Sequence, residues 1–212
     1  PGSKVVDAAA WALGQLGDSN YVGQFADRFG DIQFHDFERS GEALGKAGSK
    51  AQIERAFNIG RGDAELGTML MLYRAGLRKI VPDSAMNFAL GQLRYGHEKA
   101  QFYAAAYLGR VAELGPIEDP SKILNTLQSK VDDEVKQHLV KALRRCDSPE
   151  CTQELRAITL DTRQATATRV NAIRAAGNVH PIAEEANKAV LDPNQQVAVT
   201  AAEHIRDNVK QD

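Results

Sequence analysis

Residues 135–144 read VKQHLVKALR, with apolar residues at relative positions 0, 4, 7 and 8. On a helix of about 3.6 residues per turn these four positions share one face, so the segment predicts an amphipathic α-helix. Residues 5–14, VVDAAAWALG, place small or apolar residues at the same relative positions. A spacing that returns in a distant segment indicates an internal repeat, and a repeat of about 20 to 50 residues determines the fold of a chain.

The template occurs seven times along the chain, with neighbouring copies 29 to 35 residues apart. The copies begin at residues 5, 36, 68, 100, 135, 168 and 197. Shorter amphipathic segments lie between them, at residues 19–29, 50–59, 83–95, 118–130, 150–161 and 182–191. Glycine and proline punctuate the joints, and no stretch alternates with the period of two that strands require. Each repeat is therefore predicted to be a helix pair, and the chain to be all-α.

These repeats resemble the HEAT family, in the short form named after phycobilisome lyases. The resemblance rests on Ala-Leu-Gly at 12–14 and 43–45, on Tyr-Leu-Gly at 107–109, and on Asp-Pro-Asn at 192–194 before a helix. It implies an α-solenoid in which about six to seven antiparallel helix pairs stack as a single domain over residues 1–212. Family geometry places the second helix of each pair, which carries the template, on the concave side.

The same resemblance implies ion pairs between neighbouring repeats. HEAT repeats of this form place an acid shortly before the template and a base just after its first position. Asp31, Asp63 and Asp192 occupy the acid position, and Lys136 and Arg169 occupy the base position. Three other repeats hold no acid there, so we expect an interrupted row of ion pairs rather than a continuous one.

The start of the chain indicates that more sequence belongs to the protein. The first template copy begins at Val5, with no partner helix before it. Pro1-Gly2-Ser3 resembles a cloning remnant. We therefore expect these residues to be a piece of a longer protein.

Composition excludes several classes of function. The chain has 212 residues, of which 43% are hydrophobic and 25% are charged, the balance of an ordinary soluble protein. Its 26 Lys and Arg face 28 Asp and Glu, for a formal net charge of -2. A chain with this balance does not bind nucleic acid by bulk electrostatics, so we do not expect a nucleic-acid partner. No apolar run approaches the roughly 18 to 20 residues of a membrane span.

Motifs that carry catalysis or cofactors are missing. The sequence contains no nucleophile elbow, phosphate-binding loop or dinucleotide fingerprint. HEAT-type hydroxylases hold two irons with several His-Glu pairs, whereas this chain has one, His97-Glu98. We therefore expect no enzyme activity in this segment, no metal and no cofactor.

Cys146 and Cys151, the two cysteines, enclose four residues at a joint between helices. A disulfide there would staple the turn, provided that the α-carbons come within about 7 Å. It would imply an oxidising compartment and an exported or periplasmic protein. Two reduced thiols beside a turn, in a cytoplasmic protein, are the alternative.

Two columns of polar positions face away from the apolar side of the template helices. Relative positions 6 and 10 lie about 240° and 280° round the helix, whereas the apolar positions cluster near about 25°. We define the basic columns as the cations at these positions: Lys46, Arg74, Arg78, Arg110, Lys141, Arg145 and Arg174. Stacked repeats would align them into a ridge that binds an acidic ligand. Alternatively, cations near helix C-termini compensate the helix dipole whatever the function.

Trp11 begins one of these columns and is a candidate binding hot spot, since tryptophan is enriched at interface centres. We expect a non-catalytic scaffold that docks a protein or peptide, and an acidic one, along its concave face. The alternative is a substrate-binding arm of a larger enzyme. Residues 12–17 and 42–48 resemble bacterial chains that join HEAT repeats to a cyclophilin-type prolyl isomerase. Alkylpurine DNA glycosylase activity receives less support, because no base-accommodating aromatic and catalytic acid can be placed in one cleft. Bilin lyase activity is supported only by the shared repeat name.

Overall fold

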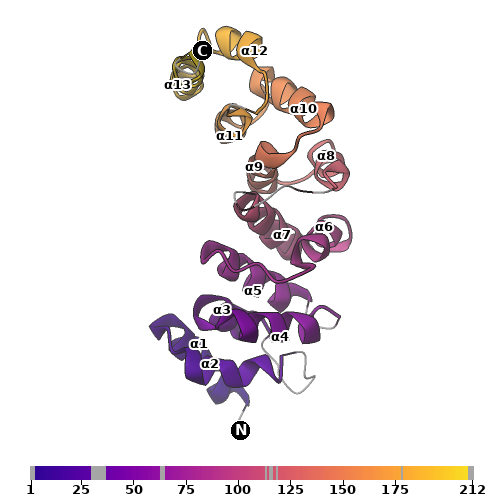
Figure 1. The fold of residues 1–212 in the computed structure, drawn as a ribbon, viewed down its shortest axis with the longest axis vertical. Helices are drawn as coiled ribbons and strands as arrows, with labels where there is room; N and C mark the ends of the chain where they lie inside the picture. The colour runs from indigo at the N-terminus through magenta and orange to yellow at the C-terminus, as the bar shows by residue number, and fades with distance from the viewer. Residues whose placement is uncertain are drawn as a thin grey trace. The chain divides into compact units, whose positions relative to one another are not determined.

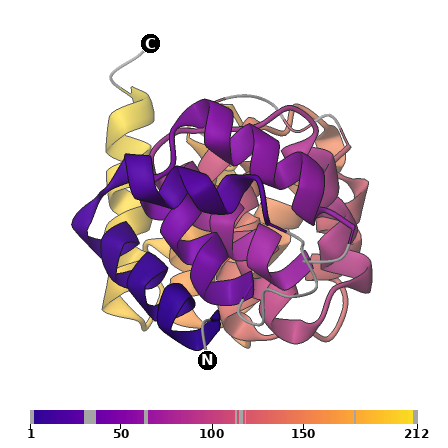
Figure 2. The same cartoon turned by 90° about the horizontal axis from the view of Figure 1, so that it is seen from below.

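The computed structural model describes residues 3–29, 37–62, 65–112, 114, 117, 119–177 and 179–209. Within these ranges every regular element is a helix and no strand occurs. No arrow is drawn in Figure 1, or from below in Figure 2. The fold is therefore all-α, as the period of the template predicts. The chain divides into two compact units, Pro1–Tyr107 and Leu108–Asp212, each with its own internal packing.

In the first unit, template helices pack side by side and the shorter helices flank them. The helices are α1 (Ser3–Leu16), α2 (Ser19–Ala26), α3 (Phe37–Ala47), α4 (Lys50–Gly60), α5 (Glu65–Leu77), α6 (Ala85–Tyr95) and most of α7 (Glu98–Val111). Helix α3 packs between α1 and α5, while α2 and α4 contact each other and this row (Figure 1). Gly45 permits the approach of α3 to α5, because a Cβ there would overlap the Met71 carbonyl oxygen. Edge-on ring contacts between Phe57 and Phe88 attach α6 to α4.

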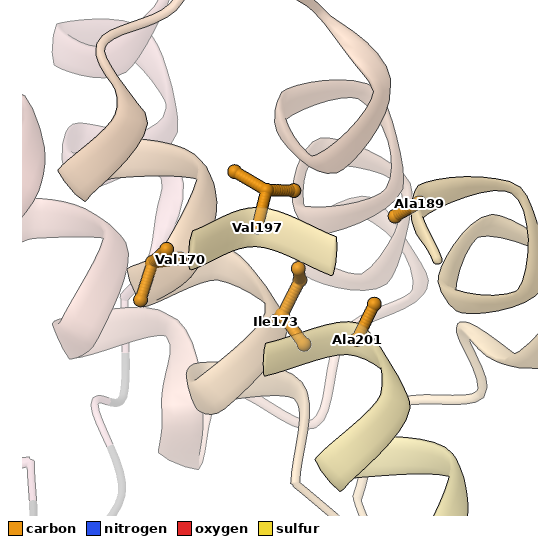
Figure 3. Packing of buried hydrophobic residues seen from close by; sticks show 5 residues of the cluster. All are labelled: Val170, Ile173, Ala189, Val197 and Ala201. Carbon is orange, nitrogen blue, oxygen red and sulfur yellow. The ribbon is translucent and has the colours of Figure 1, made fainter. Parts of the chain in front are cut away.

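The second unit repeats this arrangement. It holds the end of α7, α8 (Ser121–Leu127), α9 (Asp133–Ala142), the 3₁₀ helix η1 (Leu143–Arg145), α10 (Pro149–Leu160), α11 (Thr166–Ala176), α12 (Ala183–Ala189) and α13 (Gln195–Val209). Helix α11 packs between α9 and α13, and α10 and α12 pack against each other and against this row. Figure 3 shows the contact that fixes α13, in which Val170 and Ile173 of α11 meet Val197 and Ala201 of α13 beside Ala189 of α12.

The template positions form the core of both units. Its leucines in the central repeats, Leu44, Leu72 and Leu139, are fully buried. The prediction that the template marks the buried face is therefore confirmed for these repeats. The first copy differs, since Val5 is 70% exposed, and Leu16 at the end of the same helix is 82% exposed.

One of the expected ion pairs between neighbouring repeats is present. Arg169, near the start of α11, pairs with Asp192 before α13, and both side chains are only 6% exposed. The Arg169 hydrogen bond lowers the pKa of the Asp192 carboxyl against the opposing effect of burial. Asp31 and Asp63 lie outside the described residues, and Lys136 has no ion pair with any residue that the structure describes.

Candidate functional site

In the first unit, the basic columns surround one carboxylate. Glu42 of α3 accepts hydrogen bonds from Trp11 Nε1 of α1 at 2.9 Å and from Arg74 Nη2 of α5 at 2.8 Å. Lys46 Nζ lies 2.8 Å from the same carboxylate and also donates to Gln15 Oε1 at 2.6 Å. We call Trp11, Glu42, Lys46 and Arg74 the Glu42 cluster. It ties three successive template helices together.

The charge state of Glu42 follows from these contacts. Burial raises the pKa of its carboxyl, but the hydrogen bonds from Lys46 and Trp11 and the charges of Lys46 and Arg74 outweigh this effect. The net shift of the Glu42 pKa is downward. Two of the predicted ligand-binding cations, Lys46 and Arg74, thus share one carboxylate within the fold, and the Trp11 indole N–H donates to the same group.

Arg78 also serves the fold. Its Nη1 donates to the backbone oxygens of Gly45 at 3.2 Å and Gly48 at 2.7 Å, where α3 ends. The last carbonyls of a helix lack intrahelical partners and carry partial negative charge. Compensation of a helix end, the alternative for the basic columns, therefore applies to Arg78. The helix that it caps is the preceding template helix rather than its own.

In the second unit, three cations line an open recess. Lys141 at the end of α9, Arg144 of η1 and Arg174 of α11 border a cavity of about 230 Å³. Gly109, Asn171 and Ala175 are the other described residues that line it, and no acid is among them. Among the described residues, none of the three cationic side chains has a hydrogen-bond or ion-pair partner. We call this site the cationic recess.

Arg144 enters the recess because α9 ends in a 3₁₀ turn. Side chains advance by about 100° per residue in an α-helix and by about 120° in a 3₁₀ helix. Tightening after Ala142 brings Arg144 within about 20° of the direction of Lys141 and turns Arg145 about 100° away from it. Arg145, the residue assigned to the basic column, is exposed and is not among the lining residues of the recess.

Arg110, at the end of α7, contributes positive charge near the same helices. His138 of α9 is half-buried, and burial is the largest cause that lowers its pKa, followed by the charges of Lys141 and Arg110. The imidazole therefore stays neutral more readily than a free histidine would. The Asn171 side chain donates to the Gln137 carbonyl at 3.2 Å, which joins α11 to α9 beneath the recess.

A second recess lies between α11 and α13. Its volume is about 380 Å³, and Arg144 and Arg174 line it as they line the first. Its other lining residues are Ile173, Gly177, Thr200, Glu203, His204, Asp207 and Asn208. We call it the mixed recess, because acids from α13 face the two arginines. Burial lowers the pKa of His204 against the opposing charge of Asp207.

The turn that follows η1 is held at two points. Cys146 and Cys151 form a disulfide, with their α-carbons 6.2 Å apart. Buried His180 contacts the Leu143 carbonyl oxygen through Nε2 at 3.0 Å and the Thr152 hydroxyl through Nδ1 at 2.8 Å. A carbonyl can only accept, so Nε2 carries a proton and donates to it. These contacts fix the backbone on both sides of Arg144.

Comparison with protein-family models, with curated proteins and with solved structures gave no match. In the described part of the chain no helix has the length and apolar character to cross a membrane. Over the same residues, no three His, Cys, Asp or Glu side chains gather as metal ligands. The chemistry of the two recesses is therefore the basis for assigning a function.

Proposed function

We propose that this segment is a non-catalytic helical-repeat scaffold, an α-solenoid of HEAT-like repeats, that binds an acidic protein or peptide segment. The binding face is the one formed by the template helices. The packing of α3 between α1 and α5, and of α11 between α9 and α13, supports stacked repeats. The disulfide supports an oxidising compartment as the place where the scaffold works.

The observation that carries the proposal is the cationic recess. Lys141, Arg144 and Arg174 gather there without an acid among the described lining residues, whereas the basic-column cations of the first unit are paired or cap a helix. Like charges repel mildly at the surface, since the Debye length is about 8 Å at physiological salt. Repulsion within the cluster therefore destabilises the free protein only slightly. Carboxylates of a partner could pair with these cations without displacing an internal ion pair.

The expected affinity is modest and sensitive to salt. An exposed ion pair contributes only about 0.2–1 kcal/mol, so three such pairs alone give weak binding. Further contacts along neighbouring template helices are needed for useful affinity. Because the helices are preformed, little conformational freedom is lost when those contacts form.

Fluorescence anisotropy of a labelled octaglutamate peptide tests the proposal. We expect the double variant Lys141→Glu/Arg174→Glu to weaken binding by at least about tenfold at low salt, because attraction becomes repulsion. The matched control is Lys122→Glu/Lys130→Glu, which changes the net charge equally at exposed sites in and just after α8. The control should bind as the unmodified chain does, and both variants should keep their helical circular dichroism spectrum. Equal binding by the two double variants would overturn the proposal.

A further inference from the structure

The cationic and mixed recesses are adjacent, because Arg144 and Arg174 line both. On one side of these arginines lies Lys141 of α9, and on the other lies Glu203 of α13. The charge that lines the surface therefore changes sign between α9 and α13. A ligand that crosses α11 would meet three cations and then an acid.

The sign change occurs within one column of the repeat. Lys141, Arg174 and Glu203 all occupy relative position 6 of their template copies. Ile173 of α11 shares a buried cluster with Val197 and Ala201 of α13, which holds the two helices together (Figure 3). Arg174 and Glu203, from the same two helices, line one recess. The column is thus a physical row of side chains across three packed helices, rather than a feature of the sequence alone.

Glu203 is available to a ligand. Its carboxylate has no hydrogen-bond or ion-pair partner among the described residues, although the charge of Arg206 on the same helix interacts with it. Asp207, one turn later, is in contrast paired with Arg206 at 2.9 Å. The Glu203 carboxylate, which lines a recess of about 380 Å³, can accept hydrogen bonds from the side chain of a lysine or arginine of the ligand.

We propose that the segment bound here is charge-segregated, with acidic residues over Lys141, Arg144 and Arg174 and a basic residue against Glu203. This inference rests on the proposed function and specifies its ligand. Packed helices lie about 10 Å apart, and an extended chain advances about 3.3 Å per residue. The basic residue should therefore follow or precede the last acid by about three residues.

Four labelled peptides test this inference with the full chain. Two carry a basic end, EEEEGGKK and KKGGEEEE, and two replace that end by glutamine, EEEEGGQQ and QQGGEEEE. On a uniformly basic surface the lysines would weaken binding, because they reduce the negative charge of the peptide. We expect one lysine peptide to bind about threefold to fivefold more tightly than its glutamine counterpart, the gain of about one exposed ion pair.

The variant Glu203→Gln should abolish this gain and should not weaken binding of the glutamine peptides. Glu134→Gln, at the opposite end of α9, is the matched control and should preserve the gain. If the glutamine peptides bind but neither lysine peptide binds more tightly, the ligand is simply acidic and the inference is wrong. If neither octaglutamate nor any of the four peptides binds, the proposed function itself is wrong.

Discussion

Replacing Glu42 by glutamine removes the negative charge of the Glu42 cluster, which links α1, α3 and α5. The carboxylate is 18% exposed and receives Trp11, Lys46 and Arg74. Hydrogen bonds to charged groups contribute about 1.5–3 kcal/mol each when buried, and about 1 kcal/mol or less when exposed. Glutamine retains one acceptor oxygen but leaves two cations without a counterion. We therefore expect the free energy of unfolding to fall by about 2 kcal/mol.

Urea denaturation provides the measurement, because the chain has one tryptophan. The fluorescence of Trp11 reports on α1, and circular dichroism reports on all helices. With a urea dependence of about 2 kcal/mol per molar, the midpoint should fall by about 1 M. Glu38→Gln is the matched control on the same helix, since Glu38 makes a longer, exposed pair with Lys99 at 3.7 Å. Equal midpoints for the two variants would show that the Glu42 cluster does not stabilise the fold.

Three further predictions concern the second unit. Asp192→Asn should lower the free energy of unfolding by about 3 kcal/mol, because it leaves the Arg169 charge buried and unpaired. Asp133→Asn, at an exposed position in α9, is the matched control, and equal losses in urea melts would refute the reasoning. Reduction of the disulfide should lower the free energy of unfolding by about 2 kcal/mol, as expected for a ring of about six residues. It should also weaken octaglutamate binding, because the backbone around Arg144 is then less restrained, and unchanged affinity after reduction and alkylation would count against this link. The pKa of His138 is lower in the folded chain than in the unfolded chain, so below about pH 6.5 the unfolded chain binds more protons. The stability that neutral His138 contributes is therefore lost as the pH falls through that range. A His138 pKa at or above that of a free histidine, measured by NMR titration of the imidazole, would contradict this prediction.

The buried face was predictable because it depends only on helical period. Leu44 at relative position 8, and Leu72 and Leu139 at relative position 4, lie on one face of their helices and are all fully buried. Any sequence that keeps small and apolar residues on one side of a helix must bury that side against a neighbour. Several joints were predictable for a similar local reason, since proline and a glycine with positive φ, such as Gly17 after α1, do not continue a helix.

The division of the basic columns into engaged and available cations was not predicted. A helical wheel gives the direction of Arg74 and Lys46, but not the carboxylate that both reach. The signal was present, because Glu42 stands between Trp11 and Arg74 in the same column. Whether a side chain contacts a residue on a neighbouring helix depends on its length and on the distance between the helices. A helical wheel of one helix does not show that distance.

Arg144 was missed because the winding of α9 changes at its end. The angle of every later residue depends on whether the last turn is α or 3₁₀. Here the contact of His180 with the Leu143 carbonyl, 37 residues along the chain, accompanies the tighter turn. A contact so distant in sequence leaves no local pattern, so Arg145 rather than Arg144 was placed in the column.

The location of a bound acidic peptide tests the central claim most directly. Amide chemical shifts of the isotope-labelled chain can be followed while octaglutamate is added. We predict the largest changes at residues 139–145 and 171–177, where the end of α9, η1 and the end of α11 surround the cationic recess. Largest changes in α8, α10 or α12, or at the cations of the Glu42 cluster, would place the ligand elsewhere and contradict the account.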